Sequence, residues 1–168
     1  MVAQKRKHMK RTSLLNPSFK YSNGIAEVKV QYKSKIKSSE RKSIVTSKDS
    51  FETLKEIFNP EIVEHHEEFV ILLLNRANKL LGWAKISVGG LTGTVVDAKV
   101  IFQIALNCNA GSIILSHNHP SGNKNQSTED VNLTKKIKEG GKLLDISILD
   151  HIIYTEESYF SFSDEGIL

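Results

Sequence analysis

The sequence predicts an α/β (α+β) domain, a mixed β-sheet flanked by helices, on two observations. First, residues 69–74 form a continuous apolar run, and 79–88 has the pattern of a strand that returns beside it. Second, helical patterns at 97–107 and 127–139 alternate with a short apolar strand at 112–116. A hairpin supplies antiparallel strands and strand–helix alternation supplies parallel ones, so the sheet should be mixed.

The chain divides by composition into three parts. Residues 1–24 are basic and contain turn-forming Asn-Pro-Ser and Ser-Asn-Gly triplets, which predict a flexible tail. Residues 25–44 are expected to form a lead-in strand, with alternating apolar residues over 25–32, and a Lys/Ser-rich linker. Residues 45–168 are expected to form the domain.

The first helix and hairpin of this domain follow from local patterns. Ser50 is the expected cap of a short helix that ends before Asn59-Pro60. Phe51, Leu54 and Phe58 would share its buried face. After the strand at 69–74, residues 75–78 predict a tight turn, and Trp83 on the returning strand is expected to pack in the core or against the hairpin.

The second half of the domain should alternate helices and strands. A helix is expected from Asp97, and the strand at 112–116 would deliver the chain into His117. The following helix would end at Gly140-Gly141, and 146–154 would supply one or two final strands. The residues expected on the buried face of the helix at Asp97 are Val100, Ile101, Ile104 and Ala105.

Charge is unevenly distributed along the chain. Residues 1–50 hold 13 Lys or Arg and 3 acidic residues, whereas 51–168 hold 10 basic and 16 acidic residues. The basic arm is either a solvated tail or a weak contact for nucleic acid. The longest apolar run is too short for a membrane span, and no signal peptide is evident. Cys108 is the only cysteine, so neither a disulfide nor a cysteine zinc site is expected, and a cytoplasmic location fits.

Two histidines and an aspartate have the spacing of a metal site. His117 and His119 lie at i and i+2 at the end of an extended segment, so both imidazoles point to one side. Asp130, in the first turn of the next helix, can be brought to the same ion. Two imidazoles and one carboxylate leave a zinc position open, as in catalytic sites. The competing interpretation is that Ser127 and Asp130 are only a helix cap.

The pattern His-x-His-Pro followed by Ser127-x-x-Asp130 matches the JAMM motif of the JAB/MPN metalloproteases. The wider text, from Ser116-His-Asn-His-Pro-Ser-Gly to Leu149-Asp-His-Ile-Ile153, resembles the C-terminal domain of the RadC family. The resemblance covers roughly 45–168 and implies the JAB/MPN, cytidine-deaminase-like architecture. RadC proteins commonly carry an N-terminal helix-hairpin-helix domain. Because residues 1–24 have only the pattern of a basic tail, this chain is expected to be a short form without that domain.

The resemblance implies a role for each matching residue. His117, His119 and Asp130 would hold one Zn²⁺ per chain, and Ser127 would help to hold the oxyanion or the water. An upstream glutamate would be the general base, and two alignments select either Glu67 or Glu68. Because neighbouring strand residues face opposite sides, only one can face the metal. We favour Glu67, and in a regular strand the other glutamate would be a solvated surface charge.

The implied activity is zinc-dependent hydrolysis of a peptide or isopeptide bond in a protein or peptide substrate. The alternatives are a DNA-associated protein that uses the basic arm and a zinc-binding pseudoenzyme that binds a partner. Iron or manganese could also occupy such a ligand set. For Asp150 and His151 two interpretations stay open, namely a pair that orients a metal ligand and a buried core histidine. His65 and His66 are interpreted as surface residues.

Overall fold

The computed structural model describes residues 20–22, 25–27, 32, 34, 36–89 and 95–168. The chain forms two compact units, Met1–Lys33 and Ser34–Leu168. In the first unit, strand β1 (Lys20–Ser22) pairs antiparallel with β2 (Ile25–Glu27). The predicted strand therefore begins at Ile25 as expected, while 28–31 lie outside the described residues. The prediction of a flexible tail over 1–24 missed β1. The strand that pairs with it, β2, begins after the predicted boundary.

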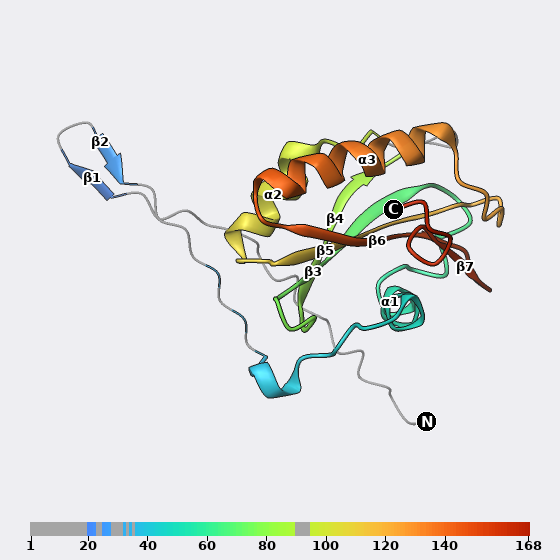
Figure 1. Cartoon of the computed structure of the whole chain (residues 1–168), viewed down its shortest axis with the longest axis horizontal. Coiled ribbons are helices and arrows are strands. Elements are labelled where there is room, and N and C mark those ends of the chain that lie inside the picture. Colours follow the sequence, from blue (N-terminus) through green and yellow to red (C-terminus); the bar gives the residue numbers. More distant parts are fainter. Residues whose placement is uncertain (1–19, 23–24, 28–31, 33, 35, 90–94) are drawn as a thin grey trace, which may run out of the picture. The chain divides into compact units, whose positions relative to one another are not determined.

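The second unit is built on a five-stranded sheet with strand order β4-β3-β5-β6-β7 (Figure 1). The strands β5 and β6 are parallel, and the other neighbouring pairs are antiparallel, so the predicted mixed sheet is confirmed. The strands are β3 (Glu68–Leu74), β4 (Leu80–Val88), β5 (Ser112–Asn118), β6 (Ser147–Tyr154) and β7 (Tyr159–Ser161).

Helices cover both faces of this sheet (Figure 1). The helices α2 (Ala98–Asn107) and α3 (Thr128–Leu143) lie on one face, and α1 (Ser47–Lys55) lies on the other. A short 3-10 helix, η1 (Ser38–Glu40), precedes α1. The inner strand β3 is buried along its whole length because both of its faces are covered.

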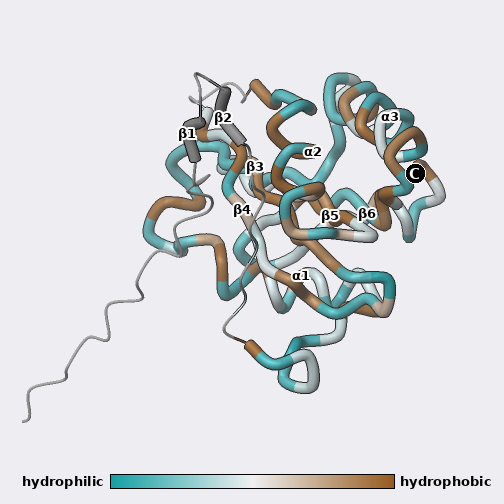
Figure 2. Tube along the Cα trace, turned by 90° about the vertical axis from the view of Figure 1, so that its left-hand side faces the viewer, coloured by the Kyte–Doolittle hydropathy of each residue, from teal (hydrophilic) through white to brown (hydrophobic). Residues whose placement is uncertain are grey.

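Two apolar clusters, one on each face of the sheet, form the core. Figure 2 shows hydrophobic stretches of the chain trace along the strands between the helices. The alternation of side chains along β3 assigns Phe69, Ile71 and Leu73 to the α2–α3 face and Val70, Leu72 and Leu74 to the α1 face. Cys108 lies in the α2–α3 cluster at 4% exposure and is a small core residue.

The helix α1 begins earlier than predicted. Its cap is Thr46, whose hydroxyl accepts from the backbone N–H of Asp49 while the Asp49 carboxylate accepts from the backbone N–H of Thr46. Ser50 is a buried residue inside the helix, so the prediction that it caps the helix was wrong. The reciprocal Thr46-x-x-Asp49 box satisfies two backbone donors at the earlier start. The predicted buried face is confirmed for Phe51, Leu54 and Phe58.

One predicted core position is exposed and another is only partly buried. Val100 is 37% exposed, Ile104 is partly buried against the core, and Ile101 and Ala105 are buried as predicted. The helix α2 is therefore buried most deeply along the stripe of these last two residues. Trp83 is 40% exposed on β4, which lies at one edge of the sheet order.

The glycines that were expected to end α3 lie inside it. The helix continues through Gly140 and Gly141 to Leu143. A Cβ on Gly140 would lie 2.7 Å from the Phe102 ring, and one on Gly141 would overlap the carbonyl oxygen of Ile146. These glycines therefore permit close packing of α3 against its neighbours.

The remaining elements agree with the pattern, with two extensions. The turn after β3 is confirmed, and Asn78 adopts a left-handed conformation there (φ 53°). The strand β5 continues two residues further than predicted and includes His117 and Asn118. The prediction of one or two final strands is met by β6 and the short β7. Among the described residues, no helix is long and apolar enough to cross a membrane.

Candidate metal centre

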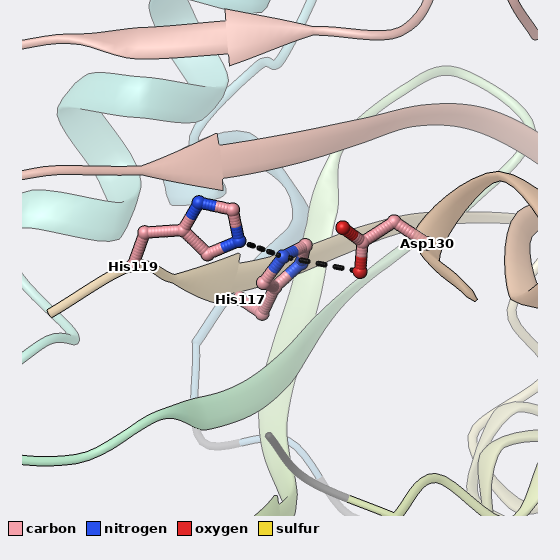
Figure 3. A group of neighbouring side chains, drawn as sticks. All are labelled: His117, His119 and Asp130. Carbon is pink, nitrogen blue, oxygen red and sulfur yellow. Dashed lines mark hydrogen bonds and ion pairs between the residues drawn. The ribbon is translucent and has the colours of Figure 1, made fainter. Parts of the chain in front are cut away.

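The end of β5 and the start of α3 bring His117, His119 and Asp130 together (Figure 3). The two histidine Nε2 atoms are 3.0 Å apart, and His117 Nε2 is 3.3 Å from Asp130 Oδ1. One potential ligand atom of each residue lies within 4.8 Å of the others. The predicted ligand set is thus assembled by a strand end and a helix start that are adjacent in space.

This spacing fits a zinc ion. Ligands bound tetrahedrally at about 2.0–2.1 Å lie roughly 3.3 Å from one another, close to the two separations above. Three ligand atoms leave one tetrahedral position for a water or a substrate. Within the described part of the chain, no other His, Cys, Asp or Glu cluster meets the same criterion.

The helix cap at the start of α3 aims Asp130 at the histidines. Its Oδ2 accepts from the backbone N–H of Ser127 at 2.8 Å and from the Ser127 hydroxyl at 2.7 Å. The Ser127 Oγ in turn accepts from the backbone N–H of Asp130 at 3.0 Å. Because the cap occupies Oδ2, the Oδ1 atom is the one that faces His117. The helix-cap interpretation is therefore confirmed, and it is compatible with a metal-ligand role for Asp130 because the cap leaves Oδ1 free.

A chain of hydrogen bonds fixes which ring nitrogen of His117 carries the proton. The Thr134 hydroxyl donates its one hydrogen to the carbonyl oxygen of Asp130, so it must accept from His151 Nδ1 at 2.6 Å. His151 Nε2 then carries a lone pair and accepts from His117 Nδ1 at 2.9 Å. His117 Nε2 is left with its lone pair directed at the site.

His119 is fixed in the same tautomer by a different partner. Its Nδ1 donates to the carbonyl oxygen of Asn123 at 2.6 Å, which leaves a lone pair on Nε2. Two imidazole lone pairs and the Asp130 carboxylate oxygen therefore converge without a proton between them. Such an arrangement of acceptors is stabilised by a cation, as the ligands of a metal site require.

Burial keeps the inner histidines neutral. Desolvation lowers the pKa of His117 to about 4; Asp130 opposes this shift, and a proton on His119 would add to it. Desolvation also lowers the pKa of the fully buried His151 well below its usual range. A neutral His117 can bind a metal ion without first losing a proton at neutral pH.

Asp150 and His151 point to opposite sides of β6. His151 packs between the rings of Phe69 and Phe162 and contacts His117. Asp150 instead accepts from the Ser161 hydroxyl at 2.6 Å and from the backbone N–H of Ser163, and burial raises its pKa. His151 is thus both a buried core histidine and the partner of a candidate ligand, whereas Asp150 binds the end of β7 and the turn that follows it.

The two candidate glutamates have different surroundings. Glu67 lies two residues before Phe69, whose ring stacks on His117, and it is half-buried. Burial raises the pKa of Glu67, with a lowering contribution from His119 and a raising one from Asp130. The candidate ligands His119 and Asp130 are therefore near enough to affect the pKa of Glu67.

Glu68 is turned to the other side. It is 4% exposed, and its carboxylate pairs with Lys85 Nζ at 2.5 Å and His66 Nε2 at 3.2 Å. The expectation that the second glutamate would be a solvated surface charge is therefore wrong, because β4 supplies a cation against it. His65 is exposed as expected, whereas His66 is half-buried in this pair.

Sequence reasoning overlooked two residues that support the site. Asn118 was noted only as part of the motif, and Thr134 was not noted at all. The position of Thr134, four residues after Asp130 in a helix, places its hydroxyl against the Asp130 carbonyl. This spacing could have pointed to Thr134, whereas the partners of Asn118 lie about fifty residues away in the chain.

Comparison with known proteins gives a consistent result. A family model described as "RadC-like JAB domain" matches residues 44–167. A UPF0758 protein of Flavobacterium johnsoniae is 50% identical over 127 residues, which are 75% of this chain and 54% of that protein. A UPF0758 protein of Aquifex aeolicus is 38% identical over 128 residues, 76% of this chain and 54% of that protein. The chain spans about half the length of these curated relatives.

Proposed function

The chain belongs to the RadC-like JAB domain family, and from this premise we propose that it is a zinc-dependent hydrolase of peptide or isopeptide bonds. The observation that carries the proposal is the convergence of three unprotonated ligand atoms beside a half-buried glutamate. A structural site has no need of such a carboxylate or of an open position.

The ligands in this proposal are His117, His119 and Asp130. Zinc, when bound there, would polarise the scissile carbonyl and acidify a water molecule. Iron or manganese would suit the same ligands, and metal analysis distinguishes them.

Glu67 is the general base in this proposal. The pKa of Glu67 is raised toward neutral pH, and a group whose pKa lies near the working pH can both accept a proton and release it. The proton taken from water would pass to the leaving amine. Glu68 is unsuited to this role because Lys85 and His66 occupy its carboxylate on the other side of the strand.

Ser127 has two proposed tasks, of which one has geometric support. Its hydroxyl hydrogen is used by Asp130 Oδ2 at 2.7 Å, so the residue orients a ligand. The role implied by family resemblance, in which the hydroxyl holds the oxyanion or the water, would require that hydrogen to change partner during the reaction.

The first test is elemental mass spectrometry on untagged protein, followed by turnover of a fluorogenic peptide library and of isopeptide-linked substrates. We expect about one zinc per chain. Glu67→Gln should retain zinc and lose turnover by roughly 10²- to 10⁴-fold. The neighbouring Glu68→Gln is the matched control and should keep most of the activity.

Either of two results would contradict the proposal. The first is a zinc content that does not change when His117 and His119 are replaced by alanine. The second is a zinc-loaded protein without turnover on any of these substrates, which would favour a partner-binding pseudoenzyme. Equal loss in Glu67→Gln and Glu68→Gln would remove the assignment of the base.

The excess of basic residues over 1–50 supports a second proposal, a weak contact with nucleic acid. It predicts DNA binding that falls steeply with salt and disappears when residues 1–24 are deleted. Affinity that is the same at low and high salt would contradict it.

A further inference from the structure

Asn118 lies between the two candidate histidine ligands, yet its side chain serves another part of the chain. It is fully buried, and strand alternation turns it to the face opposite His117. Its Oδ1 accepts from the backbone N–H of Glu68 at 2.7 Å. Its Nδ2 donates to the carbonyl oxygens of Val63 at 2.6 Å and His66 at 2.9 Å.

Two of these three hydrogen bonds flank Glu67 in the chain. The carbonyl of the preceding residue, His66, and the N–H of the following residue, Glu68, both bind this one amide. On its other side, the Glu67 carbonyl oxygen accepts from the backbone N–H of Gly89 at 2.8 Å. The backbone on each side of Glu67 is therefore attached to the strand that carries the metal ligands.

The amide geometry makes Asn118 specific for this attachment. Only a side chain with one acceptor and two donor hydrogens can satisfy one N–H and two carbonyls at once. Aspartate has the acceptor without the donors, and serine has one hydrogen for two carbonyls. The site is buried, so a lost bond is not replaced freely by water.

We propose that Asn118 is a positioning residue that fixes Glu67 relative to His117 and His119. The role rests on the proposed hydrolase function, in which Glu67 moves a proton next to those ligands. A general base that is displaced by about 1 Å can lose roughly 10²-fold in rate. Because Asn118 and His117 are neighbours on β5, the bonds of Asn118 hold the backbone of Glu67 at a set distance from His117.

The test is a double-mutant cycle on the zinc-loaded protein. Asn118→Ala should lower kcat by roughly 10- to 100-fold while zinc content stays at about one per chain. In a Glu67→Gln background, the same change should lower the residual rate by less than about twofold, because the group being positioned is already inactive. If Asn118→Ala does not fold, Asn118→Asp keeps the side-chain size and the bond to Glu68, and replaces it in the cycle.

Asn75→Ala is the matched control. The Asn75 Oδ1 also accepts from two backbone N–H groups, those of Ala77 and Lys79, but at the opposite end of β3. It should lower the melting temperature and leave kcat within about twofold. Equal losses of kcat for Asn75→Ala and Asn118→Ala would mean that Asn118 acts through general stability, and this would overturn the proposal.

A second measurement does not depend on turnover. Amide hydrogen exchange over 64–68 should accelerate at least about tenfold in Asn118→Ala relative to wild type and Asn75→Ala. Unchanged exchange there, or an equal loss of kcat with and without Glu67, overturns the positioning role and leaves the hydrolase function standing. A zinc-loaded wild type without turnover would instead contradict the hydrolase function, and exchange then tests the attachment alone.

Discussion

The starts of α1 and α3 share a local structure but differ in what surrounds them. Thr46 and Asp49 form a reciprocal capping box, and so do Ser127 and Asp130. In each, the aspartate Oδ2 accepts from the backbone N–H of the cap residue, at 2.9 Å in α1 and 2.8 Å in α3. At α3 the second oxygen of the carboxylate lies 3.3 Å from His117.

The likeness extends one turn further into both helices. Thr53 donates to the carbonyl oxygen of Asp49 at 2.8 Å, and Thr134 donates to that of Asp130 at 2.6 Å. Both threonines are buried. Only Thr134 also accepts from a histidine, His151, among the contacts of the described residues. The same pattern, Ser/Thr-x-x-Asp-x-x-x-Thr, is thus a helix start in one place and half of a candidate metal site in the other.

The comparison teaches that the local pattern orients the aspartate carboxylate, whereas the position of the helix start relative to the sheet decides what the carboxylate faces. Asp49 is only partly exposed, and backbone hydrogen bonds from Val45 and Thr46 are the main reason that its pKa is lowered. Asp130 is directed at the end of β5, where the histidines lie. Paired substitutions at equivalent positions of the two helices can separate these contributions.

The largest difference is expected for the two aspartates. Asp130→Asn keeps an oxygen for the cap but removes the charge from the site, so zinc bound at equimolar metal should fall from about one per chain to a small fraction. Asp49→Asn should leave zinc unchanged. Elemental mass spectrometry measures both, and similar zinc content in the two variants would contradict the assignment of Asp130 as a ligand.

A smaller difference is expected for the threonines. Thr134→Val leaves His151 Nδ1 without its acceptor, which should destabilise the fold by about 1–3 kcal/mol and weaken zinc binding by roughly 10- to 100-fold. Thr53→Val removes one hydrogen bond and should cost about 1 kcal/mol without an effect on zinc. Urea unfolding and a zinc competition assay measure these values. Equal zinc affinities would show that the hydrogen-bond chain does not act on His117.

The cap residues should differ only in metal binding. Ser127→Ala and Thr46→Ala each remove a cap hydroxyl and should lower stability by about 1 kcal/mol. Ser127→Ala should in addition weaken zinc binding by roughly tenfold, because the Asp130 carboxylate loses one of its supports. Competition with a chromogenic chelator gives the affinities. An unchanged affinity in Ser127→Ala would confine the serine to helix capping.

Acid should destabilise the metal-free protein through the α3 side. The pKa values of His117 and His151 are lowered in the folded state. Below about pH 6.5 the unfolded chain therefore binds more protons, and the stability decreases as the pH decreases. Between pH 6.5 and 5.5 the loss should be about 1 kcal/mol for each histidine.

Urea unfolding at the two pH values gives this loss, and His151→Phe should roughly halve it. Below pH 5.5, Glu67 and Asp150, whose pKa values are raised, would act with the opposite sign. Equal stability at both pH values would show that the histidines are not held neutral.

Much of the fold followed from the sequence because its signals are local. The apolar run of β3, the turn before β4 and the box at Ser127 are each decided within a few residues. The family pattern identified the three candidate ligands. The errors at Ser50 and at Gly140-Gly141 arose because one residue type serves two purposes. For the glycines, contacts with Phe102 and Ile146 show which purpose applies, and for Ser50 the capping box at Thr46 does.

The supports of the site were beyond such signals. Asn118 binds residues about fifty positions earlier, and His151 reaches His117 across parallel strands. No periodicity reveals such pairs before the sheet order is known. The pairing of Glu68 with Lys85 likewise depends on the register of β3 and β4, which a bulge near Phe69 alters.

The burial of Cys108 turns the native chain into its own probe of conformational opening. The thiol is 4% exposed in the cluster beneath α2 and α3, and burial raises its pKa, so alkylating reagents should react slowly with the folded protein. Since the sequence has no second cysteine, all labelling reports this layer. Labelling rates with and without added zinc would measure how strongly metal binding at α3 suppresses the opening of the layer behind it, without any engineered label.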